Sequence, residues 1–477
     1  MLKPKYLWAL LALPIGYLFI LVIHLIPVAS GASTYLAELR GTAANSENSN
    51  VPAEYAKKVD RVIADLSVPV VKQILRAAGV NLSTIRPEIK ALVSAGPTLA
   101  GAAKPQKYLI SFQNSAEARG TGGILGAFAI VEMSKGDFKI LRTGSNAALY
   151  SMNISTLPIE MPDEFLKLYG NNPGILQNSN LSPHFPYGAE IWMGLWKKKF
   201  GEDLDGVIAV DPSALSYILK STGPITLPSG EKITADNVVS ETLEKAYKRF
   251  EADNKARKDY LVQILDAAAA KIVSLEFDKR KMLSGITQGI IENRILIYSK
   301  DKEVEKTLST TRIAGFLTTE ANNEFRTVIQ NIDASKLDYY LDRSVVVESK
   351  VCKDVRETQV RITVKNSLKS GKGLPAYVLT RADKGKPADL VTGAHRFKVF
   401  IYGPTESRLV SASRENRTAN LGGGATERSR PVYVADVDLS PGQSEELQAN
   451  FAGGIGKISY IDQPLVRPTQ IEIKDKC

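Results

Sequence analysis

Residues 206–225 read GVIAVDPSALSYILKSTGPI, and this stretch decides the fold class. Its first five residues, Gly206–Val210, form a short apolar run typical of a buried strand. Asp211 and Pro212 follow, and these residue types favour the N-cap and the first position of a helix. The helix that they begin carries apolar residues at helical spacing and ends at Gly223, which suits a helix C-terminus. A strand that leads directly into such a helix predicts layered α/β packing.

The alternation of strands and helices continues on both sides of this unit. We predict further strands at Tyr108–Phe112, Ile124–Met133, Phe138–Arg142 and Arg294–Tyr298. We also predict helices over residues 235–250, 255–275 and 278–293. Trp192 and Trp196 lie one helical turn apart, a spacing typical of core residues. These elements predict an α/β core domain over residues 105–340.

The pattern changes after about residue 340. Short strand candidates separated by Gly, Pro, Asn and Asp are found at Arg343–Glu348, Gln359–Lys365, Ala376–Thr380, Arg396–Tyr402, Val432–Val437 and Ile471–Ile473. Short strands with frequent turns and no helical periodicity are typical of a β-sandwich. We therefore expect an all-β sandwich over residues 341–477.

The N-terminal region predicts a membrane anchor. Leu7–Val28 is an uncharged run, and a helix of this length spans about 33 Å, enough to cross a bilayer core. Lys3 and Lys5 precede the run, and the next basic residue is Arg40. The positive-inside rule then places residues 1–6 in the cytoplasm and the bulk of the chain outside it. The expected location is the bacterial cell membrane, with one signal anchor.

A cleaved signal peptide is the alternative for this run, because small residues at Ala29 and Ser30 could be recognised by a peptidase. The apolar run is longer than the usual core of a signal peptide, which favours the uncleaved anchor. Residues 29–104 are expected to form a linker followed by juxtamembrane helices.

Composition restricts the chemistry. The net charge of +10 favours anionic partners, and a chain outside the cytoplasm is not expected to bind nucleic acid. The sequence contains no CxxC, HExxH, GxSxG or GxxxxGK[ST] motif, so we predict no metal site and identify no cofactor. The two cysteines, Cys352 and Cys477, are a disulfide candidate in an oxidising compartment.

Four stretches of the chain resemble a known family. They are YLISFQNSAEARGTGGILGAFAIVEMSKGDFKI (108–140), LSPHFPYGAEIW (181–192), DLDGVIAVDPSALSYILKSTGPI (203–225) and ARKDYLVQIL (256–265). They closely resemble the bacterial, membrane-anchored domain-of-unknown-function family 4012. The resemblance covers roughly residues 105–345, and the family brings no known activity with it.

The order of elements also resembles the LytR-CpsA-Psr cell-wall glycopolymer ligases, which have an outer α/β domain behind one membrane helix. The residues that match that family's basic positions are Arg119, Arg142, Arg257 and Lys258, and Leu215–Ile225 matches its helix-and-turn segment. The resemblance implies that the arginines hold a polyprenyl pyrophosphate. That family also binds Mg²⁺ through aspartates, but here Gly120 and Thr143 replace them. Asp205 and Asp211 are candidate substitutes, and Mg²⁺ is expected only if the chain is a phosphotransferase of this type.

A glycine-rich turn, Arg119-Gly120-Thr121-Gly122-Gly123, is the candidate anion site. Glycines let backbone N–H groups approach a ligand, and an arginine fork suits phosphate oxygens. Glu117 lies beside the turn as a candidate carboxylate. The alternative is that Glu117 and Arg119 form a structural ion pair that orders the loop. A dinucleotide-binding turn is excluded, because Leu125 occupies the third glycine position.

Two functions follow from these observations. The first is a membrane-anchored envelope protein that binds an anionic or polyprenyl-phosphate-linked glycan. The alternative is a diverged glycopolymer phosphotransferase of the LytR-CpsA-Psr type. Convergence of Arg119, Arg142 and Arg257 with a carboxylate in one pocket would favour the transferase, and their separation would favour the binding protein.

Overall fold

The structure is a computed structural model that describes residues 82–476, apart from 136, 151–160, 171, 252, 274–276, 352–354, 381–390, 416 and 419–424. Our predictions for the segments 1–6 and 7–28, for the part of 29–104 that precedes residue 82, and for a Cys352–Cys477 disulfide lie outside these residues. Within the described part of the chain, no helix is long and apolar enough to span a membrane.

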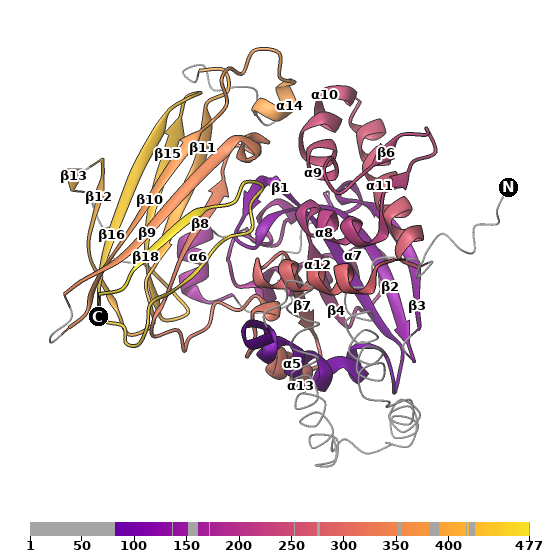
Figure 1. The fold of residues 1–477 in the computed structure, drawn as a ribbon, viewed down its shortest axis with the longest axis horizontal. Coiled ribbons are helices and arrows are strands. Elements are labelled where there is room, and N and C mark those ends of the chain that lie inside the picture. The colour runs from indigo at the N-terminus through magenta and orange to yellow at the C-terminus, as the bar shows by residue number, and fades with distance from the viewer. Residues whose placement is uncertain are drawn as a thin grey trace.

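The fold is mixed α/β, with several sheets and helices (Figure 1). The first sheet has the order β3-β2-β1-β4-β7, and only the β1–β4 pairing is parallel. Its strands are β1 (Gln106–Arg119), β2 (Gly122–Ser134), β3 (Asp137–Ser145), β4 (Gly206–Val210) and β7 (Ile295–Ser299). The strands predicted in this region are all present, and β4 has the predicted limits.

Helices cover both faces of this sheet because successive residues of its strands point to opposite sides. Leu109 and Val207 pack against α7 (Phe185–Phe200) on one face, where Trp192 and Trp196 are buried as predicted. The other face packs against α5 (Leu82–Leu99), α8 (Pro212–Thr222), α12 (Lys279–Ile291) and α13 (Lys302–Leu308). The result is a three-layer arrangement around β1 and β4.

The unit that decides the fold class is confirmed. An oxygen of the Asp211 carboxylate accepts a hydrogen bond from the backbone N–H of Ala214 at 2.7 Å, as an N-cap should. Gly223 ends α8 with a φ of 76°. Farther along the chain, the helix predicted over 235–250 consists of α9 (Val238–Ser240), a π-helical turn (Glu241–Lys245) and α10 (Ala246–Phe250). The next predicted helix is α11 (Asn254–Val273).

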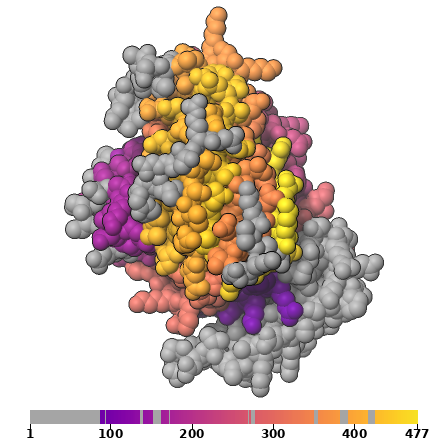
Figure 2. Space-filling model, turned by 90° about the vertical axis from the view of Figure 1, so that its left-hand side faces the viewer, coloured from indigo at the N-terminus to yellow at the C-terminus, as the bar shows by residue number. Residues whose placement is uncertain are grey.

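The C-terminal part contains two further sheets that share one apolar core. The six-stranded sheet contains β13 (Arg417–Thr418), β12 (Arg408–Arg414), β16 (Ser444–Ala452), β10 (Glu357–Asn366), β9 (Leu341–Val351) and β18 (Gln470–Lys474). The five-stranded sheet contains β14 (Ala425–Glu427), β15 (Arg430–Leu439), β11 (His395–Tyr402), β8 (Glu324–Asn331) and β17 (Ser459–Ile461). In Figure 2 orange and yellow residues of this C-terminal part face the viewer.

Two details of the predicted sandwich are wrong. β8 lies in the five-stranded sheet between β11 and β17, so the sandwich begins before residue 341. The segment Ala376–Thr380 was predicted as a strand, but it forms the short helix α14 (Ala376–Leu379). Pro375 stands at the N-cap of this helix, and Val378 is buried against Leu337 and Leu368, so tertiary packing overrides the strand propensity.

A pH-dependent feature lies at the end of β7. One oxygen of Glu305 accepts the backbone N–H of Ser299 at 2.8 Å, and the carboxylate of Glu190 lies close enough to repel it. Burial, together with Glu190, raises the pKa of Glu305 from 4.5 to about 8. A raised carboxyl pKa contributes stability that is present below pH 4.5 and is lost as the pH rises through 8.

We therefore expect Glu305→Gln, which keeps a neutral side chain, to gain stability relative to the wild type as the pH rises. The gain at pH 8.5 should be on the order of 1–2 kcal/mol and should vanish near pH 4.5. Thermal unfolding at both pH values measures it, and Glu303→Gln on the exposed side of α13 is the matched control. An equal difference in stability between Glu305→Gln and wild-type protein at both pH values would contradict the raised pKa of Glu305.

Candidate anion-binding site

The glycine-rich turn is buried and packs closely against the backbone of neighbouring segments. Ala118 and Arg119 pair with Gly123 and Gly122, so residues 120 and 121 connect β1 to β2. A Cβ atom added to Gly120 would lie 2.2 Å from the carbonyl oxygen of Leu181, and one added to Gly123 would lie 2.3 Å from the carbonyl carbon of Asn114. Close backbone packing therefore explains these two glycines without a ligand.

Side chains complete the packing of this turn. The Thr121 hydroxyl donates to the side-chain oxygen of Gln113 at 2.8 Å. The amide of Asn180 donates to the Thr121 hydroxyl and to the Gly123 carbonyl, each at 2.9 Å. Asn180 directly precedes the LSPHFPYGAEIW stretch, so this contact holds the start of that stretch near the turn.

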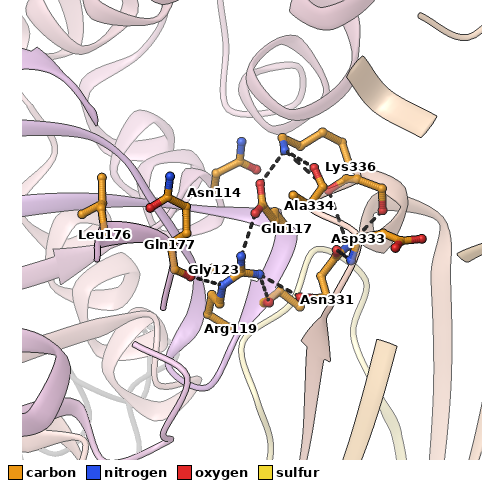
Figure 3. Close-up of polar contacts among 12 residues, drawn as sticks. Asn114, Glu117, Arg119, Gly123, Leu176, Gln177, Asn331, Asp333, Ala334 and Lys336 are labelled. Atoms are coloured by element: carbon orange, nitrogen blue, oxygen red, sulfur yellow. Dashed lines mark hydrogen bonds and ion pairs between the residues drawn. The ribbon is translucent and has the colours of Figure 1, made fainter. Parts of the chain in front are cut away.

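Arg119 has only 4% of its surface exposed. Its guanidinium donates to the carbonyl oxygens of Gln177 at 2.9 Å, Ala118 at 2.9 Å and Asn331 at 3.2 Å, and to the Glu117 carboxylate at 2.8 Å (Figure 3). These contacts favour the structural alternative for the Glu117–Arg119 pair. A role for Arg119 and the turn in anion binding stays a prediction.

Glu117 lies between two cations, as Figure 3 shows. One carboxylate oxygen accepts from Arg119, and the other accepts from the Lys336 ammonium at 2.5 Å. Burial alone would raise the pKa of Glu117, but Lys336 and Arg119 outweigh it and hold the pKa below the ordinary value of 4.5. Sequence reasoning missed Lys336, because 219 positions separate it from Glu117 and no local pattern marks it.

A second buried carboxylate, that of Asp338, lies near Glu117. One oxygen of Asp338 accepts the backbone N–H of Ala118 at 2.9 Å and the amide of Asn331 at 2.7 Å. Its other oxygen lies 3.3 Å from Nε2 of His395, without hydrogen-bond geometry. Burial raises the pKa of Asp338, but His395 and these donors outweigh it, so the pKa lies below 3.8.

Arg257 is a buried cation of a different kind. It lies on α11 with 3% of its surface exposed, and its guanidinium carbon lies 4.4 Å from the ring centroid of Tyr247 and 4.3 Å from that of Tyr377. The two rings are stacked, with centroids 5.9 Å apart. Its side-chain hydrogen bond goes to the amide oxygen of Asn254. Within the described residues, no carboxylate forms an ion pair with Arg257.

Lys258 follows Arg257 and lies at a more exposed position. Its ammonium lies 5.5 Å from the ring centroid of Tyr150. Burial, and then the charge of Arg257, lower the pKa of Lys258 below its ordinary value. Burial and the nearby Glu117 raise the pKa of the Tyr150 hydroxyl, which places Tyr150 close to the carboxylate as well.

These residues form one group, which we call the cationic cluster: Glu117, Arg119, Tyr150, Tyr247, Arg257, Lys258, Lys336 and Tyr377. Tyr377 links its two halves, because the Lys336 ammonium lies 4.8 Å from the Tyr377 ring that also contacts Arg257. Three buried cations (Arg119, Arg257 and Lys336) and the partly exposed Lys258 adjoin two carboxylates, Glu117 and Asp338. Such an excess of positive charge is suited to holding an anion.

The other predicted site residues lie elsewhere. Arg142 lies over the rings of Phe200 and Trp196 and pairs with Glu202 at 3.6 Å. One oxygen of Asp205 accepts the backbone N–H of Lys107 at 2.8 Å. Asp211 caps α8 and pairs with Arg294 at 2.5 Å, so both aspartates have structural partners. The described part of the chain contains no group of three or more potential ligands placed to hold a metal ion.

Comparison with known proteins gives a match to one family model over part of the chain, and no activity. No curated protein matches the chain. Among solved structures, a candidate nutrient-binding protein from Legionella pneumophila is similar over 28% of this chain and 43% of that one, at 9% identity and a TM-score of 0.14, which is too low to support any argument. Residues 103–247, which include β1, the glycine turn and Tyr247, match the family described as "Protein of unknown function (DUF4012)".

Proposed function

We propose that this protein is a membrane-anchored envelope protein that binds an anionic, phosphate-type group at the cationic cluster. The observation that carries the proposal is Arg257, a buried guanidinium held on two tyrosine rings with no carboxylate partner among the described residues. Burying an unpaired charge is costly, so proteins retain such groups where a partner of opposite charge binds. The rigid guanidinium fork matches phosphate oxygens.

The ligand class that we propose is an anionic or polyprenyl-phosphate-linked glycan of the cell envelope. Three observations support it: the uncharged N-terminal run expected to anchor the chain, the net charge of +10, and the resemblance to glycopolymer ligases at Arg257 and Lys258. A protein that is anchored in the membrane with its bulk outside the cytoplasm would meet lipid-linked phosphates at that membrane.

Binding is better supported than the transferase alternative. The transferase hypothesis needs Arg119, Arg142 and Arg257 in one pocket, but the partners of Arg142 are Glu202, Phe200 and Trp196. It also needs a carboxylate set for Mg²⁺. Asp205 and Asp211 stand at opposite ends of the five-residue strand β4, which separates them by about 16 Å or more along the strand.

The test is calorimetry on the full-length protein in detergent, titrated with inorganic pyrophosphate and separately with a polyprenyl phosphate. Arg257→Gln should weaken binding by about 10- to 100-fold, the effect of losing a charged hydrogen-bond donor. Arg249→Gln is the matched control. Arg249 also lies over a ring, that of Tyr260 at 4.9 Å, but it already has carboxylate partners in Glu231 and Glu241.

Equal affinities for Arg257→Gln and wild-type protein would end the proposal. The two probes separate the sources of the phosphate. Binding of both probes would indicate a site for the phosphate group alone. Binding of the polyprenyl phosphate alone would indicate that the lipid chain contributes.

A further inference from the structure

One residue covers both buried cations on the sandwich side of the cluster. The ring of Tyr377 lies 4.3 Å from the guanidinium carbon of Arg257 and 4.8 Å from the ammonium of Lys336. Arg257 and Lys336 have 3% and 4% of their surfaces exposed. In this arrangement an anion in solvent cannot reach either group, whereas Lys258 and Tyr150 remain partly exposed beside them.

Tyr377 belongs to a segment attached mainly to the sandwich. We call Ser367–Thr380, which includes α14, the cover segment; Figure 1 shows α14 beside α10. The backbone N–H of Lys336 donates to Val378 at 2.8 Å, and that of Ser367 donates to Tyr340 at 2.8 Å. Toward the α/β part, the cover segment presents the Tyr377 ring, which stacks on Tyr247 of α10.

The two kinds of attachment differ in strength. The backbone of the segment is held by hydrogen bonds on the sandwich side and by a small apolar core of Leu337, Leu368 and Val378, to which Tyr247 of α10 also contributes. On the α/β side Tyr377 makes ring–ring and cation–π contacts, which an anion bound to the same cations can replace. A displacement of Tyr377 can therefore expose Arg257 and Lys336 while the sandwich stays intact.

We propose that Tyr377 is the gate of the cationic cluster: an anionic ligand first meets Lys258 and Tyr150, and it reaches Arg257 and Lys336 only when the Tyr377 ring swings away. This inference rests on the proposed function, since a gate has a role only if an anion binds behind it. In this proposal the cover segment controls whether the ligand can enter the cationic cluster. The closed state lowers the observed affinity in proportion to its population.

The rate at which phenylglyoxal modifies Arg257 tests the gate without any ligand. Phenylglyoxal reacts with accessible guanidinium groups, and peptide mass spectrometry of the full-length protein reports each arginine separately. Tyr377→Ala should speed the labelling of Arg257 by about 10-fold or more, as expected if the closed state holds over 90% of molecules. Tyr377→Phe keeps the ring and should label at the wild-type rate. Arg249, which is exposed in the same protein, is the internal control.

Two results would overturn the inference. If Arg257 in Tyr377→Ala labels as slowly as in the wild type, Tyr377 does not gate it. If Arg249 labels faster by the same factor, general loosening of the fold explains the faster labelling of Arg257, and Tyr377 is not a gate. Adding pyrophosphate to the Tyr377→Ala protein separates the two proposals. If pyrophosphate does not slow the fast labelling of Arg257, the anion site is wrong, but Tyr377 still controls access to Arg257.

Discussion

Replacing Glu117 with glutamine should lower the free energy of unfolding by about 3–5 kcal/mol, the effect of leaving buried cations without their counter-ion. Glu117 is 3% exposed, and its two oxygens pair with Arg119 and Lys336. A neutral amide cannot balance either charge, and its NH₂ group would face one of the two donors. Urea unfolding of Glu117→Gln and wild-type protein at pH 7 measures the loss.

The dependence on pH provides a second check of the same residue. Because the folded pKa of Glu117 lies below 4.5, its stabilising contribution is present above pH 4.5 and is lost as the pH falls through the folded value. The difference between Glu117→Gln and wild type should therefore shrink in acid. Glu132→Gln, on the partly exposed side of β2, is the control and should change little. An equally small loss at pH 7 for both variants would show that the ion pair is dispensable.

Gly120→Ala should destabilise the protein by about 3 kcal/mol, at the upper end of the range for overpacking. The added methyl group would lie 2.2 Å from the carbonyl oxygen of Leu181 and 2.3 Å from the carbonyl carbon of Ser182. These are backbone atoms, so no side-chain rotation relieves the clash. The variant should also move the segment before α7, which holds Asn180 against the turn.

Gly126→Ala is the matched control for that prediction. Gly126 lies in the same hairpin, but a Cβ atom there would lie 3.4 Å from the Phe112 carbonyl oxygen, an ordinary contact. We expect its melting temperature to stay within a few degrees of the wild type. A similar melting temperature for Gly120→Ala would mean that the turn can shift, and it would restore the turn as a candidate site for a ligand.

Local patterns predicted the fold better than they predicted the site. The unit from Gly206 to Gly223 has its strand, cap and stop signal within 18 neighbouring residues, so its limits could be predicted from the sequence. β8 was missed because its alternation is short and follows the α/β elements directly. The helix α14 was mistaken for a strand because its conformation depends on packing against distant residues.

The sequence also identified only part of the candidate site. Arg257, Lys258 and Glu117 were identified from the sequence, the first two by resemblance and the third by its place beside the turn. The sequence could not identify Lys336 and Tyr377, because each reaches the cluster from the sandwich, far along the chain. Arg142 matched the resemblance by position in sequence, yet the sheet places it beside α7. Spacing along a chain does not determine which face of a sheet a side chain occupies.

The distance along the chain between Glu117 and Lys336 has a consequence during synthesis. A ribosome adds the 219 intervening positions at about 5–20 residues per second, so Lys336 follows Glu117 by roughly 10–40 s. The outer strand β7, at Ile295–Ser299, also arrives late, so the edge of β4 stays unpaired in the meantime. Throughout this interval Glu117 can pair with Arg119 in the same hairpin, but its second partner, Lys336, does not yet exist. The complete buried ion pair therefore forms only after the first segment of the sandwich has been translated.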